Sequence, residues 1–533
     1  MLEHLQASLP EGLAIRSGAH QDKGRIISGL SFDSRRVVHG DLFFALTGGE
    51  NDGHAYIQEA IHKGASAVVG ERALERLQVP YIQVTSSRMA LAHLAAAFYG
   101  HPAKRLTVIG VTGTDGKTTT ANLIFQILQA AGLRVGLIST VNAVIGEEII
   151  DTGFHVTTPE ATDIQYYLSM MVAESLTHVV LEATSHGLAQ HRVAACDFDI
   201  GVVTNITHEH LDYHISYPAY RRAKASIFDI LASKGPKNFI DSRYAVLNRD
   251  DESYGYLDEY VRQPHLQARG EIDIANYGIQ KPADVYAKDI AVTRDGVEFT
   301  AVGVDFQIPV RSWLRGGYNV PNCLAAIAST VMALGINPEF AAKGIENLRY
   351  LPGRMERIDL GTKFLTIVDF AHTPNALRNS LLSLRQILND ENGPGRVIAV
   401  FGSAGLRDRA KRRMMAEISA ELADITILTA EDPRTESLDE ILDEMSSGCR
   451  AKNGVEGTTF WRIRDRGEAI RFAVGHAHDG DAVVILGKGH EQSMCFGETE
   501  YAWDDRTALS AAISQQMGIT GPKMPYLPTQ DEA

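Results

Sequence analysis

The sequence predicts an α/β protein of three domains, the central one built on a doubly wound parallel sheet with a small β flap and the last one Rossmann-like. The chain has 533 residues, which at about 150 residues per domain suggests about three domains. Short apolar runs typical of buried strands alternate with helical segments. The pattern of predicted strands and helices changes twice along the chain, so the predicted domains are 1–104, 105–350 and 351–533.

Composition indicates a globular protein and excludes several classes. The chain is 44% hydrophobic and 22% charged, with a formal charge of −15, which argues against disorder and against a basic surface for nucleic acid or anionic membrane. Its four cysteines form no CxxC pair, so neither a disulfide scaffold nor a cysteine zinc site is expected, and a reducing cytoplasm fits. The sequence predicts no signal peptide and no membrane span.

The first predicted domain, residues 1–104, is a small α/β unit. Strands are predicted over 28–36, which runs into a polar turn, and over 40–46 and 65–69, with a helix over 56–63. Strands and helices that alternate over so short a stretch are typical of a compact α/β domain.

The second predicted domain has a strongly doubly wound pattern. Its first strand, 106–112, is an apolar run followed by a helix over 117–131. Such runs are typical of parallel strands buried on both faces. Residues 284–312 alternate instead, which predicts an antiparallel flap attached to the sheet. Further buried strands are predicted over 178–183, 200–205 and 244–248.

The third predicted domain is a second doubly wound sheet. Helical segments separate its apolar runs. Ligands of such sheets bind beyond the carboxyl ends of the strands, and the polar motifs of this region lie there. The predicted strands are 364–370, 396–401, 425–429 and 482–486.

A glycine-rich segment joins the first strand of the second domain to its helix. Glycines let backbone N–H groups face a phosphate, the helix N-terminus and Lys117 add positive potential, and Thr118 can hold Mg²⁺. Val111 stands where the standard spacing has glycine, so this is a variant phosphate loop in an ATPase-like domain. A glycine-rich turn without a ligand is the alternative. The segment is Gly113, Thr114, Asp115, Gly116, Lys117, Thr118 and Thr119.

This loop resembles the ATP loop of the Mur ligase family, the amide ligases that build the stem peptide of peptidoglycan. Further segments match in the right order over nearly the whole chain, most closely in the members that add the third residue. The resemblance implies that ATP phosphorylates the D-Glu γ-carboxylate of UDP-N-acetylmuramoyl-L-Ala-D-Glu and that a diamino acid attacks the acyl phosphate. It further implies two Mg²⁺ ions and a cytoplasmic monomer without nucleic-acid or membrane partners.

The resemblance also assigns residues to the UDP-linked substrate and to the metal ions. For Thr158, helix capping ahead of Pro159 is an alternative. The substrate residues are Ser31, Asp33, Ser34, Thr157, Thr158, Thr184, Ser185 and Arg192. The metal ligands are Thr118, Glu182, His210 and Lys224, the last as a carbamate formed from CO₂.

Two of these metal assignments have alternatives in the residues themselves. His208, His210 and His214 could suggest zinc, but they follow a strand rather than lie on a helix, and no fourth ligand is obvious. Lys224 alone would be interpreted as a solvated helix lysine. Glu182, by contrast, follows a buried strand opposite the phosphate loop, where a carboxylate suits Mg²⁺.

The remaining assignments concern ATP and the incoming amino acid. The resemblance gives catalytic roles to Lys117, Lys224, His210 and Arg354, with Arg354 reaching ATP as the domains close. Asn322 would lie near the adenine and Asp369 at the ribose, with His372 nearby; capping is the alternative for Asn319, and a polar helix N-terminal group for His372. The amino-acid residues are Arg407, Glu431, Asp432, Arg434, Gly487 and Glu491, which could otherwise form loop salt bridges.

Arg407 and Arg434 suit an amino acid with a distal carboxylate, which favours meso-diaminopimelate over L-lysine or L-ornithine. Two departures from the family pattern oppose this: Leu406 replaces an acid, and Asp432 replaces an asparagine and could neutralise Arg434. A folylpolyglutamate-synthase-like ligase shares the ATP core, but the segments 33–35, 157–159 and 431–434 argue against it. A non-catalytic nucleotide-binding module is the last alternative, and the amino-acid pocket argues against that.

Overall fold

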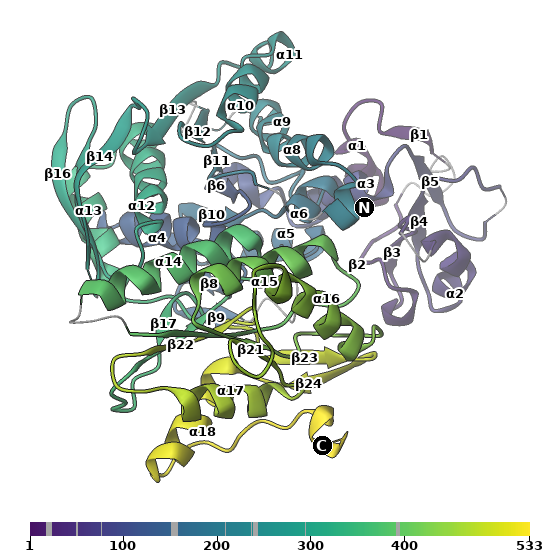
Figure 1. Ribbon diagram of the computed structural model, residues 1–533. Coiled ribbons are helices and arrows are strands. Elements are labelled where there is room, and N and C mark those ends of the chain that lie inside the picture. The colour runs from purple at the N-terminus through teal and green to yellow at the C-terminus, as the bar shows by residue number, and fades with distance from the viewer. Residues whose placement is uncertain are drawn as a thin grey trace.

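The computed structural model describes residues 1–532 except 18–23, 49–51, 76, 151–157, 208, 210, 236, 238–242, 294 and 391–394. Figure 1 shows three parts of the chain: a purple N-terminal part, a large blue-to-teal part and a green-to-yellow C-terminal part. Each part has a sheet and its own apolar core. We call them the N-terminal, central and C-terminal domains. No helix in the described ranges is both long and apolar enough to cross a bilayer.

The N-terminal domain has a five-stranded sheet in the order β1-β5-β4-β3-β2, parallel except for β1. Its core reaches Ala161 and Ala195 of the central domain, so the two domains share apolar surface. The strands are β1 (Ala14–Ser17), β2 (Gly29–Ser31), β3 (Asp41–Phe44), β4 (Ala67–Gly70) and β5 (Tyr81–Val84). The helices are α1 (Leu2–Ala7), α2 (Ile57–His62) and α3 (Ser87–Phe98).

The central domain has an eleven-stranded sheet in the order β16-β15-β14-β13-β12-β11-β6-β10-β7-β8-β9. Its middle strands are parallel and mostly buried, and an antiparallel extension closes each end. The strands are β6 (Thr107–Thr112), β7 (Val135–Ile138), β8 (Ala143–Ile145), β9 (Glu148–Ile150), β10 (His178–Glu182), β11 (Ile200–Val203), β12 (Tyr244–Asn248), β13 (Asp273–Gly278), β14 (Val285–Thr293), β15 (Gly296–Val302) and β16 (Gln307–Ser312).

Helices cover both faces of the central sheet, and a separate apolar core lies on each face. α4 follows the glycine-rich segment directly, and α12 and α13 pack against it. The helices are α4 (Lys117–Ala130), α5 (Ala161–Ala173), α6 (Ser185–Ala189), α7 (Leu211–His214), α8 (Tyr217–Ala225), α9 (Ile227–Ser233), α10 (Tyr254–Val261), α11 (Pro264–Gln267), α12 (Asn319–Ile327) and α13 (Pro338–Asn347).

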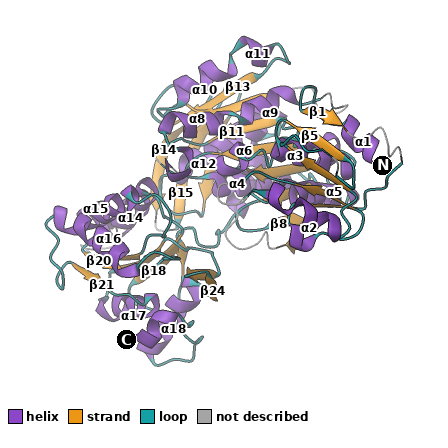
Figure 2. Cartoon of the chain, turned by 90° about the vertical axis from the view of Figure 1, so that its right-hand side faces the viewer, coloured by secondary structure: helices purple, strands orange, loops and turns teal. Residues whose placement is uncertain are grey.

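The C-terminal domain has a six-stranded sheet in the order β17-β18-β22-β19-β20-β21, parallel except for β17, and a separate β23–β24 hairpin. Figure 2 shows it as a distinct layered unit beside the central domain. The strands are β17 (Glu356–Arg357), β18 (Leu365–Asp369), β19 (Val397–Phe401), β20 (Ile425–Leu428), β21 (Phe460–Arg462), β22 (Ala482–Leu486), β23 (Ser493–Phe496) and β24 (Thr499–Ala502). The helices are α14 (Pro374–Asp390), α15 (Ala410–Leu422), α16 (Leu438–Ala451), α17 (Arg466–His476) and α18 (Asp505–Met517).

The predicted fold class is confirmed, including the parallel central sheet, its flap and the doubly wound last domain. Every strand predicted from an apolar run is present within a few residues. The flap consists of β14, β15 and β16, paired antiparallel. A second extension, β8 and β9, was not predicted, because its strands are only three residues long and one is mostly exposed.

Candidate active site

The phosphate loop curls around two glycines that no other residue could replace without movement. Gly113 and Gly116 have φ of 153° and 81°, which L residues rarely adopt. A Cβ on Gly113 would lie 1.8 Å from Thr204 Oγ1, and one on Gly116 would lie 2.3 Å from Asn322 Oδ1. The Lys117 ammonium donates to the carbonyl of Thr114 at 2.8 Å. The loop therefore runs directly into the N-terminus of α4, and a loop backbone followed by a helix N-terminus is suited to binding phosphate.

Polar groups from three segments converge beside this loop. The Thr118 hydroxyl donates to the Glu182 carboxylate, 3.1 Å from each of its oxygens, and the backbone N–H of Thr140 donates to the same carboxylate at 3.0 Å. Thr118 and Glu182 are both buried. A buried hydroxyl and carboxylate beside a phosphate site are the hard oxygen ligands that Mg²⁺ prefers, so these residues fit a magnesium ion.

Lys224 lies under the same loop rather than in solvent. Its ammonium is buried, donates to the Gly113 carbonyl at 2.5 Å and lies 4.7 Å from the centre of the Tyr220 ring. Burial and the neighbouring Lys117 lower the pKa of Lys224 well below its usual value, against the opposing effect of Glu209. The alternative of a solvated helix lysine is therefore wrong.

The structure describes only part of the histidine-rich segment. His208 and His210 lie outside the described residues, so the predicted magnesium role of His210 stays a prediction. His214 packs against Tyr220, with ring centres 5.3 Å apart. Among the residues that are described, no group of three or more histidine, cysteine or acidic side chains could hold a metal ion.

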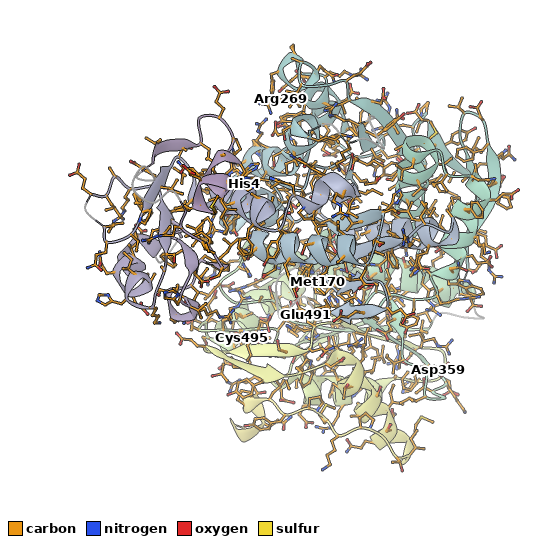
Figure 3. The ribbon with its side chains drawn as sticks, turned by 180° about the vertical axis from the view of Figure 1, so that it is seen from behind. His4, Met170, Arg269, Asp359, Glu491 and Cys495 are labelled. Atoms are coloured by element: carbon orange, nitrogen blue, oxygen red, sulfur yellow. The ribbon has the colours of Figure 1, made fainter. Side chains whose placement is uncertain are left out.

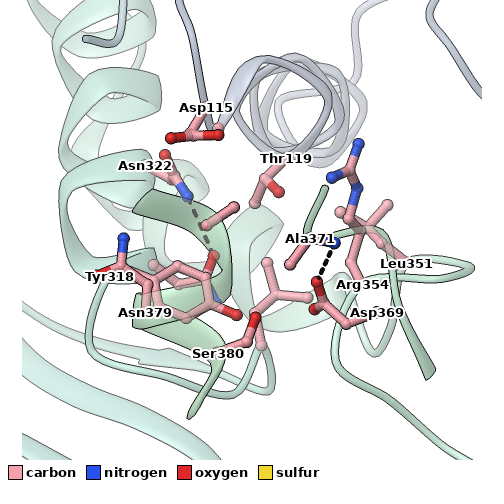
Figure 4. A pocket seen from close by; sticks show the side chains of 14 residues that line it. Asp115, Thr119, Tyr318, Asn322, Leu351, Arg354, Asp369, Ala371, Asn379 and Ser380 are labelled. Atoms are coloured by element: carbon pink, nitrogen blue, oxygen red, sulfur yellow. Dashed lines mark hydrogen bonds between the residues drawn. The ribbon is translucent and has the colours of Figure 1, made fainter. Parts of the chain in front are cut away.

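A pocket lies between the phosphate loop, α12 and the C-terminal domain (Figure 4). Asn322 donates to Asn319 Oδ1 at 3.1 Å, and Asn319 in turn donates to the Arg315 carbonyl. Tyr318, not Asn319, is the N-cap of α12, so capping by Asn319 is wrong. The lining residues are Asp115, Gly116, Thr119, Leu314, Tyr318, Asn319, Asn322, Leu351, Arg354, Asp369, Ala371, Ala376, Asn379 and Ser380.

Arg354 and Asp369 form the C-terminal side of this pocket. Asp369 accepts the backbone N–H groups of Met355 and Ala371, each at 2.7 Å. Its burial raises the pKa of this carboxyl, although Arg354 opposes the shift. The Arg354 guanidinium stacks on Phe370 and donates to the Thr118 hydroxyl at 3.2 Å. Arg354 thus meets the phosphate loop across a domain boundary, and Asp369 lines the same pocket.

Two histidines of this boundary make contacts that the sequence did not predict. His372 Nε2 lies 3.3 Å from the carboxylate of Glu209, which is buried in the histidine-rich segment. Its Nδ1 contacts the Phe370 carbonyl at 2.9 Å, so His372 joins two domains rather than only beginning a helix. His490 lies on the loop that follows β22, and Thr140 of the central domain hydrogen-bonds to it through its backbone.

Three predicted substrate residues come together at the start of α6. The Thr158 and Thr184 hydroxyls are 3.0 Å apart, and Arg192 donates to the Thr158 carbonyl at 2.7 Å and pairs with Glu160 at 2.8 Å. Within the described residues the buried Ser185 hydroxyl has no hydrogen-bond partner, so it is available to a ligand. Thr157 lies outside the described residues.

The capping alternative for Thr158 is wrong, because α5 begins at Ala161 with Glu160 as its N-cap. The remaining substrate residues lie at the end of β2. Asp33 accepts the backbone N–H of Arg35, whose guanidinium holds the pKa of that carboxyl down at about 2. The Ser31 hydroxyl donates to the Asp33 carbonyl at 3.0 Å, and that of Ser34 to Glu59 at 3.0 Å.

The predicted amino-acid residues lie at the carboxyl ends of the neighbouring parallel strands β20, β19 and β22. A Cβ on Gly487 would lie 2.1 Å from Glu431 Oε2, so these loops touch. Burial raises the pKa of Glu431, and within the described chain Oε2 has no hydrogen-bond partner. Arg434 donates to the Gly405 carbonyl at 2.9 Å, while Arg407 is exposed on the adjoining loop.

The backbone of these loops is held in an unusual conformation. Leu406, Asp432 and Arg434 have φ of 55°, 40° and 53°. Such left-handed residues other than glycine cost about 1–3 kcal/mol each and persist where surrounding contacts fix them, commonly at binding sites.

Asp432 has a partner that the sequence did not reveal. Lys488, which is almost wholly buried, lies 3.0 Å from Asp432 Oδ2 and 2.5 Å from Glu491. Burial alone would lower the pKa of Lys488, but Glu491 and Asp432 outweigh it and raise it. Figure 3 shows Glu491 and Cys495 on the side of the C-terminal domain that faces the rest of the chain. Asp432 therefore has a cationic partner besides Arg434, although it shares Lys488 with Glu491, and whether it also neutralises Arg434 stays a prediction.

A phosphate loop with magnesium-type oxygen ligands, facing a second α/β domain that carries its own polar pocket, defines an enzyme that uses a nucleoside triphosphate on another substrate. Three family models match the chain: the Mur ligase family, catalytic domain, over residues 26–99, the Mur ligase middle domain over 111–330, and the Mur ligase, glutamate ligase domain, over 353–489.

Whole-length relatives agree with these matches. The UDP-N-acetylmuramoyl-L-alanyl-D-glutamate--2,6-diaminopimelate ligase of Geobacillus kaustophilus (strain HTA426) is 40% identical over 512 residues, 96% of this chain and 99% of that protein. The UDP-N-acetylmuramyl-tripeptide synthetase of Roseiflexus sp. (strain RS-1) is 41% identical over 496 residues, 92% of this chain and 95% of that protein. The chain therefore belongs to the Mur ligase family of ATP-dependent amide ligases.

Solved structures show the same fold. A UDP-N-acetylmuramoyl-L-alanyl-D-glutamate--2,6-diaminopimelate ligase is 31% identical with a TM-score of 0.62, covering 92% of this chain and 95% of that chain. The Mycobacterium tuberculosis folylpolyglutamate synthase has a TM-score of 0.60 at 15% identity, covering 81% of this chain and 96% of that chain. At that identity the likeness shows the shared fold alone.

Proposed function

We propose that this enzyme adds meso-diaminopimelate to UDP-N-acetylmuramoyl-L-alanyl-D-glutamate in peptidoglycan biosynthesis. The names of several relatives at about 40% identity support this substrate pair. The observation that carries the choice of amino acid is the Asp432–Lys488 pair at 3.0 Å. Because Asp432 is paired with Lys488, the cations of Arg434 and Arg407 are suited to the distal carboxylate that diaminopimelate has and that lysine and ornithine lack.

The chemistry follows in two displacements. A γ-carboxylate oxygen of the D-glutamyl residue attacks the γ-phosphorus of ATP, and ADP leaves with the electrons of the broken P–O bond. The amine then attacks the acyl carbon, the C–O bond to phosphate breaks, and the amine loses a proton. Lys117, the N-terminus of α4 and Arg354 offset negative charge on the transferring phosphoryl group. Glu431, buried and with an acceptor oxygen that has no partner in the described chain, suits the ammonium of the amino acid.

Thr118, Glu182 and His210 would hold magnesium, and Lys224, as a carbamate, would contribute a second set of oxygen ligands. Bound Mg²⁺ supplies charge neutralisation between ATP and the substrate carboxylate. Support for the Thr118–Glu182 site comes from two buried oxygen groups 3.1 Å apart beside the phosphate loop. Support for the carbamate comes from the burial of Lys224, which lowers the pKa of its side chain and so favours the neutral amine that can add CO₂.

The UDP-linked substrate would occupy the surface between the N-terminal and central domains. Ser185, whose buried hydroxyl has no partner among the described residues, and Arg192 would contact it together with Thr158 and Thr184. We further propose that the domains divide as 1–104, 105–350 and 351–533, and that the enzyme acts as a cytoplasmic monomer without nucleic-acid partners.

A competition experiment tests the amino acid. Purified enzyme receives ATP, Mg²⁺, the UDP-linked dipeptide and equimolar meso-diaminopimelate, L-lysine and L-ornithine, and the products are separated by mass. We expect the diaminopimelate product to dominate. The R434A variant should then lose about 2–5 kcal/mol in kcat/KM for diaminopimelate, the range for breaking a buried charge pair.

The R413A variant is the matched control, since Arg413 forms an exposed ion pair with Glu417 on α15. It should leave the competition unchanged. Dominance of lysine or ornithine in the product, with R434A near wild type, would make the proposed amino acid wrong. An ATPase activity that needs neither the dipeptide nor an amino acid would contradict the ligase reaction itself.

A further inference from the structure

The phosphate loop is joined to the C-terminal domain through the side chain of one residue, Asp115. Asn375 Nδ2 donates to Asp115 Oδ2 at 2.8 Å, and the Thr373 hydroxyl lies 3.4 Å from Asp115 Oδ1. Both partners lie at the N-terminal end of α14, far away in the sequence. Asp115 also lines the pocket between the domains (Figure 4), so this contact stands at the edge of the proposed nucleotide site.

The backbone of Asp115 cannot follow the C-terminal domain, because the central domain fixes it. Its N–H donates to Asn205 Oδ1 at 2.9 Å. Its carbonyl accepts the Thr204 hydroxyl at 2.6 Å and Asn205 Nδ2 at 3.1 Å. Three hydrogen bonds thus hold the main chain to the segment that follows β11, and only the side chain reaches across to α14.

The α14 side of the contact is equally well built. Thr373 precedes Pro374, the first residue of the helix, and its hydroxyl accepts the backbone N–H of Ala376 at 3.1 Å, as an N-cap does. The positive end of a 17-residue helix therefore faces the Asp115 carboxylate. A charge-assisted hydrogen bond from Asn375 adds to this attraction.

We propose that Asp115 and Asn375 form a latch that couples docking of the C-terminal domain to the conformation of the phosphate loop. Asn375 is thereby a positioning residue of the ligase reaction. The expected effect of the latch on kcat rests on the proposed function. Its effect on the docking of the C-terminal domain does not. Docking brings Arg354 to Thr118, so a chain that cannot close the latch should bind ATP yet transfer phosphate slowly.

An exchange of the two side chains tests the latch, because aspartate and asparagine have the same shape. In N375D two carboxylates face each other. We expect kcat to fall about 10- to 100-fold, the range for a misplaced reacting group, with a smaller change in KM for ATP. In D115N/N375D the amide and carboxylate are exchanged, the carboxylate now lies in the first turn of α14 where an anion is favoured, and kcat should largely recover.

Small-angle X-ray scattering with a non-hydrolysable ATP analogue provides a second readout that needs no knowledge of the substrates. N375D and D115A should have larger radii of gyration than wild type, and the exchanged pair should be as compact as wild type. R378Q, which alters the exposed ion pair between Arg378 of α14 and Glu421 of α15, is the control and should match wild type.

Wild-type kinetics and compactness in N375D would overturn the latch, as would an exchanged pair no better than N375D. Failure of the proposed function is distinguishable. No amide product from wild type with any amino acid, together with the expected order of radii, would contradict the function and support the latch.

Discussion

Removing the Lys488 ammonium should destabilise the C-terminal domain strongly, because it leaves two carboxylates without their cation. Lys488 is 1% exposed and lies between Asp432, 8% exposed, and Glu491, 24% exposed. Breaking a buried pair by removing one partner costs about 3–5 kcal/mol. Glu491 can rehydrate, and Asp432 keeps the backbone N–H of Cys495 at 2.9 Å. We therefore expect K488M to lower the free energy of unfolding by an amount at the lower end of this range, about 3 kcal/mol.

Thermal unfolding followed by tryptophan fluorescence measures this change. The C-terminal domain contains Trp461 and the buried Trp503, two of the three tryptophans of the chain. For a domain of this size, a loss of about 3 kcal/mol should lower the Tm by about 6–12 °C. The double variant K488M/D432N removes the more buried of the two stranded charges and should unfold at a higher temperature than K488M.

The stability losses of D432N, K488M and the double variant together test whether Asp432 and Lys488 interact. If K488M has the same Tm as wild type, the buried pair does not stabilise the domain as described. If the losses of D432N and K488M simply add in the double variant, Asp432 and Lys488 do not interact. A genuine pair also predicts a higher KM for the amino acid in K488M, because an unbalanced carboxylate would then lie close to Arg434.

Three further outcomes are expected. K117M should lower kcat about 10²–10³-fold while leaving the fold intact, measured by phosphate release and circular dichroism. K224A should be inactive, and short carboxylates should partly restore it; mass spectrometry of wild type in bicarbonate should show one added CO₂, and an active K224A would contradict the carbamate. Burial lowers the pKa of His490 to about 3 and of His93 to about 4, so both stay neutral in the folded chain while the unfolded chain takes up protons near pH 6.5. The free energy of unfolding should therefore fall as pH drops from about 6.5 towards 4, and H93Q should reduce that fall in chemical denaturation.

Much of the fold was predictable because its signals are local. An apolar run such as 106–112 can be buried on both faces only in the middle of a parallel sheet, and this is where β6 lies. The glycines of the phosphate loop likewise indicate a backbone that other residues cannot adopt. The short β8–β9 extension lacks such a signal, since its few residues form strands only by pairing with β7.

The contacts that complete the site could not be predicted in this way. From the sequence, Asp432 was a doubtful position because it replaces an asparagine of the family pattern and could neutralise Arg434. Its ion-pair partner is Lys488, on another loop of the same sheet edge. Asn375 gives no signal either: it follows Pro374 at a helix start, where a polar residue is ordinary. Only the docking of two domains brings it to Asp115.

Thr118 shows how the separate parts converge on one group. A hydroxyl has one proton and two lone pairs. The proton is directed at Glu182, and one lone pair accepts Arg354 from the C-terminal domain at 3.2 Å. The second lone pair faces the Thr140 hydroxyl 3.5 Å away, so a cation bound there would replace that long contact rather than the one with Arg354. The same hydroxyl thus contacts the proposed metal ligand Glu182 and the docked domain from within the loop, which explains why a residue so distant in sequence as Arg354 lies at the phosphate loop.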